Sequence, residues 1–563
     1  MFFVALTLTL SSGLGSLTPV IISRAIDLVT GNSSLQNIIL VSVAIIVVGC
    51  LGWLFNYFRQ KLTAEIVGAV VLKIQEDVFK KTIEHDLSFY DNHPSGKIVS
   101  RITSDTQDFT QVVTLVIDLL SQFLLVFILI IWLFSINVFL SLVLLCMSPV
   151  AIFIALLFRK IAREVTRHSK RVTAGINSQI QESINGIMIA KAFRQEKTLY
   201  RQFITNNKLA YKVGVRRGIV INVIFPLIGT ATAFSTALIM YLSGAAVKSG
   251  GMTPGTWYLF MQAVGLFWWP MLNIASFWNQ FQDGLSAAER VFALIDREPK
   301  VKQNGENLRI NVKGKIEFRD VSFSYNDKEQ ILDHFNLLIR PGETVALVGH
   351  TGAGKSSIAR LISRFYEFQD GQILVDDQDI RSLELKHYMN FVGLVPQDPF
   401  LFSGTVADNI RYSRPEATDK EVQYAATHVG SGEWITDLPR GLNTDVGHRG
   451  SSLSMGQRQL VALARVLLKN PAIFILDEAT ASVDPFTEYQ IQEGLTSVMQ
   501  SRTAVVIAHR LSTVKKADRI LVMEEGKIIE EGTHDSLLLA GGHYAVLYNT
   551  YFRHQALEYI ERN

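Results

Sequence analysis

Long apolar runs dominate the first half of the chain. They occupy residues 2–22, 37–58, 112–134, 137–158, 219–247 and 256–282. Each run is close to or above the roughly 20 residues that a helix needs to cross the hydrocarbon layer of a membrane. One such run could be a buried helix of a large soluble core, but six in one half of a chain predict a six-span, all-α transmembrane domain.

The lysines and arginines between these runs are concentrated in two long stretches, 59–109 and 159–217. The other connections are short, and Lys248 is the single basic residue in them. Because basic loops stay on the cytoplasmic side, we expect both stretches to be cytoplasmic. With six spans, the second half of the chain would lie in the cytoplasm as well. No basic segment precedes Phe2, so we expect the first run to be a span and not a signal peptide.

The two basic stretches keep apolar residues at helical spacing over 66–87 and 177–203. This spacing predicts that the spans continue as helices well beyond the membrane. We expect the direction to reverse at 88–96, where asparagine, proline and glycine favour a turn, and again at 182–191.

A polar stretch, 297–314, has the composition of a linker. It indicates a linker (296–312) between a predicted transmembrane domain (1–295) and a second domain (313–563). Short β-type runs alternate with helical segments in the second domain. The runs are 316–323, 344–349, 391–396, 472–476, 504–508 and 520–523. Several are apolar throughout, which predicts an α/β domain with strands buried on both faces of a mostly parallel sheet.

Composition narrows the possible partners. The chain has 54 Lys+Arg against 51 Asp+Glu, and this near balance gives no reason to expect nucleic acid. Cys50 and Cys146 both lie inside apolar runs, so we expect them to be small buried residues and not a disulfide or metal site.

A phosphate-loop motif, Gly349-x4-Gly354-Lys355-Ser356, follows an apolar strand and precedes a helical stretch. Its glycines allow backbone N–H groups to surround the phosphates at the positive end of the helix. The lysine reaches the β- and γ-phosphates, and the serine hydroxyl can bind Mg²⁺. The expected ATP-contacting residues here are Gly349, Thr351, Gly352, Ala353, Gly354, Lys355, Ser356 and Ser357.

Two carboxylates, Asp477 and Glu478, end the apolar strand that begins at Ile473. A carboxylate at this position can hold Mg²⁺, which prefers oxygen ligands, and its neighbour can act as a general base toward water. A surface pair that only ends a strand is the alternative, but it fits poorly beside a phosphate loop. The motifs together predict hydrolysis of a nucleoside triphosphate.

The segments LSMGQRQ (453–459), ILDEATASVD (475–484) and VIAHR (506–510) resemble the nucleotide-binding domain of ATP-binding cassette (ABC) transporters. The first half resembles the exporter-type membrane domain. The resemblance covers nearly the whole chain and implies a half-transporter that uses ATP and Mg²⁺ and works with a second half-transporter chain.

The resemblance also implies roles for residues outside the phosphate loop. Tyr325 matches the aromatic that stacks on adenine, Gln397 matches a glutamine that contacts Mg²⁺ and water, and His509 matches the γ-phosphate switch. Ser482 and Asp484 match the loop that crosses between the two ATPase domains. The turns near Asn92 and Gly186 would be coupling helices. The implied catalytic residues are Glu478 and His509, and the implied metal ligands are Ser356, Gln397 and Asp477.

The family signature acts on ATP held by the other chain, and here it comprises Ser454, Met455, Gly456 and Gln457. Met455 stands where the family has glycine, and His448 stands where exporters commonly have glutamate. In heterodimeric exporters one chain often keeps its glutamate but has an altered signature. We therefore expect a heterodimer with one hydrolysing site; a homodimer that tolerates the methionine is the alternative.

The resulting prediction is an ATP-driven exporter in the cell (inner) membrane. It would move small hydrophobic or amphipathic compounds, such as drugs or lipids, by alternating access, surrounded by membrane lipid. Asp118 is the main charge within the spans and is a candidate functional group. An ATP-gated channel or regulatory subunit, and an importer with the exporter fold, are the alternatives. The apolar spans exclude a soluble ABC ATPase of DNA repair or translation.

Overall fold

The computed structural model describes residues 2–31, 34–302, 312–326, 329–477, 484–508 and 510–552. The chain divides into two compact units. The first comprises Met1–Ile83 and Gly96–Arg297, and the second comprises Glu84–Ser95 and Glu298–Asn563. The short stretch Glu84–Ser95 therefore belongs to the second unit, although the first unit surrounds it in sequence.

The first unit is built from long helices. They are α1 (Phe2–Thr30), α2 (Leu35–Glu84), α5 (Thr106–Ile136), α6 (Val138–Asn185), α8 (Glu196–Lys248) and α9 (Pro254–Ile295), joined by the short α4 (Ser95–Ser100), the π-helical turn Arg101–Asp105 and α7 (Ile187–Ala192). Each predicted apolar run lies within one long helix, except that Asn137, the first residue of the fourth run, caps α6. In the described part of the chain, four segments are long and apolar enough to cross a membrane: Phe2–Thr30, Leu35–Glu84, Ser95–Ile136 and Gly229–Lys248. The number of six spans remains a prediction.

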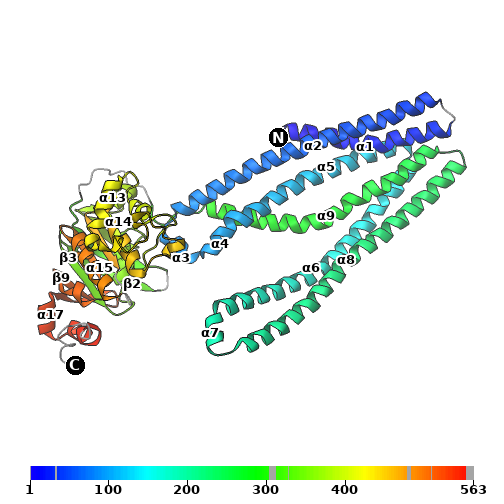
Figure 1. Cartoon of the computed structure of the whole chain (residues 1–563). Helices are drawn as coiled ribbons and strands as arrows, with labels where there is room; N and C mark the ends of the chain where they lie inside the picture. Colours follow the sequence, from blue (N-terminus) through cyan, green and yellow to red (C-terminus); the bar gives the residue numbers. More distant parts are fainter. Residues whose placement is uncertain are drawn as a thin grey trace. The chain divides into compact units, whose positions relative to one another are not determined.

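Helices α6 and α8 run side by side for much of their length and are joined at their tip by α7 (Figure 1). This tip confirms the reversal predicted at 182–191. Ile187, Met188 and Ile189 of α7 are exposed apolar side chains within the first unit.

Helices α5 and α9 approach each other closely at Gly284 of α9. A Cβ atom there would lie 2.0 Å from Cγ2 of Val112. Nearby, Arg290 of α9 donates two hydrogen bonds to Asp105, at 2.7 and 2.9 Å. The small residue and the bidentate ion pair together hold the two helices in one register.

The structure corrects the prediction about the cysteines of the first unit and adds a partner for Asp118. Cys50 and Cys146 are exposed, so the expectation that they are buried is wrong. Each lies on an exposed face of a long apolar helix, Cys50 on α2 and Cys146 on α6. Asp118 is paired, because Arg59 of α2 donates to its carboxylate at 2.8 Å. Arg59 is only 7% exposed, so this pair links α2 to α5.

The second unit contains a six-stranded sheet in the order β10-β9-β3-β8-β7-β6. Its strands are β3 (Thr344–Gly349), β6 (Val392–Val395), β7 (Ile473–Asp477), β8 (Thr503–Ile507), β9 (Arg519–Glu524) and β10 (Lys527–Gly532). All neighbours are parallel except β9 and β10. The mostly parallel sheet is confirmed, although β10 was not predicted.

A second sheet is antiparallel, in the order β2-β1-β4-β5. It comprises β1 (Ile316–Ser324), β2 (Gln330–Ile339), β4 (Asp370–Val375) and β5 (Gln378–Asp379). Only β1 was predicted from the sequence. The exposed positions of β2 and β4 interrupt their apolar pattern, which is why those strands were missed.

Strand residues of the six-stranded sheet alternate between two hydrophobic cores. Val345 and Leu347 of β3 lie in one core, and Ala346 and Val348 lie in the other. Strands β7 and β8 alternate in the same way, which explains their continuous apolar sequences. The helices of the unit are α3 (Leu87–Asn92), α10 (Lys355–Ile362), α11 (Leu385–Asn390), α12 (Val406–Arg411), α13 (Asp419–Thr427), α14 (Met455–Lys469), α15 (Pro485–Met499), α16 (Leu511–Lys515), α17 (His534–Ala540) and α18 (His543–Leu547).

Candidate functional site

The carboxyl ends of the parallel strands gather most of the predicted site at one edge of the sheet. The phosphate loop follows β3, Asp477 ends β7, and Gln397 lies just beyond β6. Ligands of open α/β sheets bind at this edge, outside the carboxyl ends of the strands. Glu478, Ser482 and His509 lie outside the described residues.

The phosphate loop depends on its glycines. Gly349, Gly352 and Gly354 have φ values of +149°, +89° and +96°, a region that side chains disfavour. A Cβ atom on Gly349 would also lie 2.2 Å from the carbonyl oxygen of Met523. Thr351 is exposed on the loop and Ala353 is 5% exposed beneath it. The loop is therefore a backbone cradle that leads directly into α10.

Lys355, the first residue of α10, points back into this cradle. Its Nζ atom donates to the carbonyl oxygens of Gly349 and His350, each at 2.8 Å. Burial lowers the pKa of Lys355, and the negative charge of Asp477 opposes that effect. The structure thus brings the predicted phosphate-binding lysine and the predicted metal-binding aspartate close enough to interact electrostatically.

Tyr325 also lies beside α10. Its hydroxyl is 2.9 Å from Oγ of Ser357, and Arg360 donates to the same hydroxyl at 3.1 Å. Its ring packs edge-on against Phe323 and Tyr366. These contacts position the aromatic that is expected to stack on adenine next to the phosphate loop.

The expected Mg²⁺ ligands form an all-oxygen set. Asp477 lies at the end of β7, Ser356 at the start of α10, and Gln397 is exposed after β6. Mg²⁺ is usually held by one or two carboxylates together with phosphate oxygens and water. One carboxylate, one hydroxyl and one amide oxygen at the phosphate-binding edge fit that chemistry.

The signature segment begins α14. Ser454 caps the helix and accepts a hydrogen bond from the Gln457 backbone at 3.2 Å, while the Gln457 side chain accepts from the Ser454 backbone at 3.0 Å. This capping box stabilises the helix start. Met455 is the first helical residue and is half-buried, and Gly456 is buried. Met455 has no positive φ, so the backbone at this position does not require glycine.

Two further predicted residues, Asp484 and His448, are exposed on the second unit. Asp484 caps α15 and accepts from the Thr487 backbone at 2.9 Å. That hydrogen bond is the main cause of its lowered pKa. His448 is exposed, next to Gly447. A capping role for Asp484 was not predicted, although an aspartate directly before Pro485 is a recognisable helix start.

The sequence did not indicate how the segment Glu84–Ser95 contacts the rest of the second unit. The backbone N–H of Leu87 donates to the carbonyl of Phe365 at 3.3 Å. The hydroxyl of Tyr366 donates to Asp91 at 2.6 Å. These contacts attach α3, the helix expected near Asn92, to the residues that follow α10.

Comparisons with known proteins agree with this architecture. Residues 1–271 match the family model of the ABC transporter transmembrane region, and residues 332–481 match that of the ABC transporter. A Bacillus subtilis protein named uncharacterized ABC transporter ATP-binding protein YknV is 38% identical over 88% of this chain and 83% of its own length. A Desulfotalea psychrophila ATP-dependent lipid A-core flippase is 36% identical over 88% of this chain and 86% of its own length.

Two further relatives extend the comparison. The B. subtilis probable multidrug resistance ABC transporter ATP-binding/permease protein YheH is 36% identical over 88% of this chain and 74% of its own length. The solved structure of a bacterial Atm1-family ABC exporter with ATP bound has a TM-score of 0.81 and 26% identity, and covers 97% of each chain. The chain therefore belongs to the ABC transporter family, as an exporter-type half-transporter that couples ATP hydrolysis to transport.

Proposed function

We propose that this chain is the hydrolysing subunit of a heterodimeric exporter of hydrophobic or amphipathic compounds. A half-transporter of this family works as a dimer. The proposal places the transporter in the cell membrane, with the ATPase unit and the two basic loops in the cytoplasm. The basic stretches 59–109 and 159–217 support that orientation.

Met455 is the observation that carries the heterodimer proposal. It occupies the first turn of α14, at the helix end that would face ATP bound to the partner. Since its backbone is helical, its difference from glycine is the bulk of a thioether side chain. That bulk would hinder close approach of the helix amides to a phosphate, so the site that uses this signature would be weak.

The other site would use the phosphate loop of this chain together with the signature of the partner. Glu478 would polarise the attacking water, and His509 would contact the γ-phosphate. Ser482 and Asp484 would form the loop that crosses to the partner. Mg²⁺, held by Ser356, Gln397 and Asp477, would neutralise charge on the phosphate oxygens.

The substrate class rests on the relatives and on the character of the spans. The relatives compared above include a probable multidrug resistance transporter and a lipid A-core flippase. Trp268 of α9 is 3% exposed within a core of apolar side chains. Asp118 is engaged by Arg59 and is therefore a poor anchor for a cationic compound. Drugs or lipids with little charge fit this environment.

The ATPase activity of the purified chain tests the proposal. We expect weak turnover from the chain alone and full turnover when it is co-purified with a partner that has a glycine signature. Glu478→Gln in this chain should lower the turnover of the pair about a hundredfold or more, because it removes the general base.

Two variants of the signature separate side-chain bulk from helix stability. Met455→Gly and Met455→Ala both shorten the side chain, but only alanine preserves helix propensity. We expect both variants to raise the activity of the chain alone. Vigorous activity of the unaltered chain alone, abolished by Glu478→Gln, would instead establish a catalytic homodimer.

A further inference from the structure

The chain passes between its two units three times, at Ile83–Glu84, Ser95–Gly96 and Arg297–Glu298. Two of these crossings lead to one carboxylate. Asp86 is the third residue after the first crossing, and its partner Lys300 is the third residue after the last crossing. Any movement passed along the chain between the units at these two points therefore passes close to Asp86.

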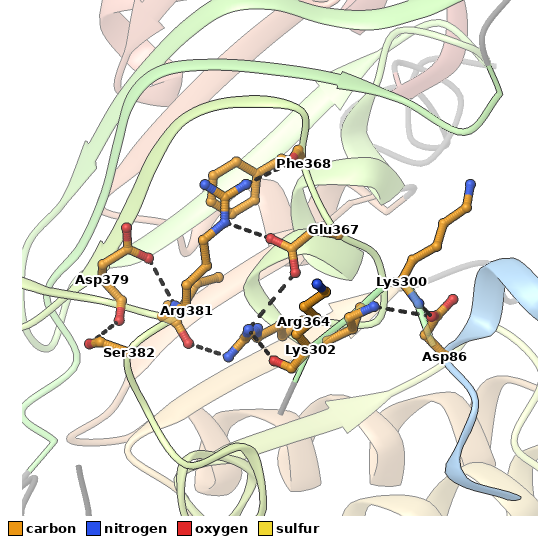
Figure 2. A network of polar contacts seen from close by, with 11 residues as sticks. Asp86, Lys300, Lys302, Arg364, Glu367, Phe368, Asp379, Arg381 and Ser382 are labelled. Atoms are coloured by element: carbon orange, nitrogen blue, oxygen red, sulfur yellow. Dashed lines mark hydrogen bonds and ion pairs between the residues drawn. The ribbon is translucent and has the colours of Figure 1, made fainter. Parts of the chain in front are cut away.

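The two oxygens of Asp86 have different partners. Oδ1 caps α3 by accepting from the backbone N–H of Ser88 at 3.0 Å, and it also accepts from the Ser88 hydroxyl. Oδ2 accepts from the backbone N–H groups of Lys300 at 2.6 Å and Val301 at 3.1 Å. Figure 2 shows Asp86 and Lys300 facing each other across this contact. One side chain thus starts a helix and holds the linker that follows α9.

The charge state of Asp86 suits this role. Burial raises the pKa of its carboxyl group, but the hydrogen bonds from Ser88, Val301 and Lys300 outweigh burial, so the net pKa is lowered. The carboxylate is ionised at neutral pH, and hydrogen bonds to an ionised acceptor are stronger than neutral ones.

Arg364 holds the same linker from the other side (Figure 2). It donates to the carbonyl oxygen of Lys302 at 2.9 Å and also to the carbonyl of Ile380. Arg364 is 4% exposed and has a φ of +48°, just past the last residue of α10. Since α10 starts in the phosphate loop, Arg364 connects the linker to the far end of the phosphate-binding helix.

A second arginine braces this contact. Oε2 of Glu367 lies 3.8 Å from Nη2 of Arg364, and Oε1 of Glu367 accepts from Nε of Arg381 at 2.6 Å. The Arg381 guanidinium lies 3.8 Å from the ring centre of Phe368 and donates to its carbonyl at 2.6 Å. Figure 2 shows the alternating charges of Arg364, Glu367 and Arg381 in one row of contacts. Such a row favours one position of the buried arginine.

We propose that Asp86 is a positioning residue for ATP-driven transport. By capping α3 and holding Lys300 and Val301, it joins α3, the linker and the end of α10 into one rigid element. A displacement of α10 on nucleotide binding is then delivered at two points of the chain, to α2 through Glu84 and to α9 through Arg297. Asp86 lies outside the phosphate loop and acts through the elements that it joins.

Asp86→Asn is the sharpest test in the full-length chain, in the dimer in which it purifies. Asparagine is isosteric and remains a good helix cap. Its amide group, however, presents a donor where Oδ2 accepted from the linker. Asp86→Ala removes both the cap and the linker contact. Asp77→Asn is the matched control, because it removes the same charge from an exposed pair with Lys73 on α2.

Hydrogen exchange and ATPase kinetics give the readouts. Without nucleotide, we expect the amides of Lys300 and Val301 to exchange faster in Asp86→Asn than in the unaltered protein. In a separate ATPase assay, the kcat and KM for ATP should stay near those of the unaltered protein. On addition of ATP, the change in exchange in 60–83 of α2 and 283–295 of α9 should shrink about threefold or more, within the range seen for altered coupling. Asp77→Asn should leave every readout unchanged.

Three results would overturn the proposal. The first is unchanged exchange of the linker amides in Asp86→Asn, since the contact of Asp86 with Lys300 and Val301 would then not exist in solution. The second is faster linker exchange with the full ATP-dependent change still present in α2 and α9. The third is the absence of any such change in the unaltered protein. Failure of the proposed function would appear separately, as absent ATP hydrolysis by the unaltered protein, and would leave the nucleotide-free test of the linker intact.

Discussion

Two charged side chains of the second unit, Lys355 and Asp86, form their hydrogen bonds mainly with backbone groups. The ammonium group of Lys355 donates to two loop carbonyls, and the carboxylate of Asp86 accepts from three backbone N–H groups. Such contacts bind a side-chain charge to the path of the main chain. A change in the loop or the linker therefore changes the charge environment directly, without an intermediate side chain.

Gly349 provides a test at the residue scale. We expect Gly349→Ala to lower the free energy of unfolding and to abolish ATP binding, because the new methyl group would lie 2.2 Å from the Met523 carbonyl oxygen. Thermal unfolding and binding of a fluorescent ATP analogue measure both effects.

The matched control for that substitution is Gly342→Ala. Gly342 also has a positive φ, +75°, but its Cβ would meet nothing within 4 Å. This variant should cost about 1–2 kcal/mol through backbone strain alone and should keep ATP binding. If both variants bind ATP equally well, the cradle does not depend on close packing at Gly349.

At the scale of elements, helix caps set where helices begin, and close contacts set how helices pack. The reciprocal cap of Ser454 and Gln457 sets where α14 begins, and therefore places Met455 in its first turn. In the first unit, the pair of α5 and α9 depends on a small residue, Gly284, and on the ion pair of Arg290 with Asp105. Within lipid, where apolar surface gains little from burial, such close packing and polar contacts provide most of the attraction between helices.

Gly284→Ala tests that packing. We expect it to lower the free energy of unfolding by about 1–3 kcal/mol, the usual cost of overpacking, because Val112 and α5 must shift. Gly265→Ala on the same helix is the control, since its Cβ meets nothing within 4 Å. Thermal unfolding in detergent should separate the two variants, and equal melting temperatures would show that α5 can move without cost.

At the scale of the whole molecule, the sites of a dimer would be unequal. The phosphate loop, Lys355 and Asp477 form a coherent site in this chain, whereas its signature carries Met455. We therefore expect that trapping with ADP and vanadate retains one nucleotide per dimer of the natural pair. Quantifying the bound nucleotide by mass spectrometry measures this ratio. Two trapped nucleotides per dimer would mean that the methionine does not impair the second site.

The sequence was most informative where one physical rule acts on consecutive residues. Apolar runs of membrane length predicted the long helices, and continuous apolar strands predicted β3, β6, β7, β8 and β9. The phosphate loop was equally clear, because its glycine spacing is required by backbone geometry. The antiparallel sheet was largely missed, since β2 is interrupted by exposed polar residues and β4 begins with three polar or small residues before a short apolar run. The predicted burial of the cysteines was wrong, because an apolar sequence does not distinguish the core of one chain from an apolar surface that the chain exposes.

By itself, the sequence determined the membrane half, the ATPase half and the family, and it predicted which residues would contact the phosphates, because each follows from local spacing and composition. The tertiary structure alone decided which distant groups meet. It paired Arg59 with Asp118, placed the hydroxyl of Tyr325 on Ser357, and brought Asp86 to the linker at Lys300. Contacts between residues tens or hundreds of positions apart depend on how whole elements pack, and no local pattern encodes that packing.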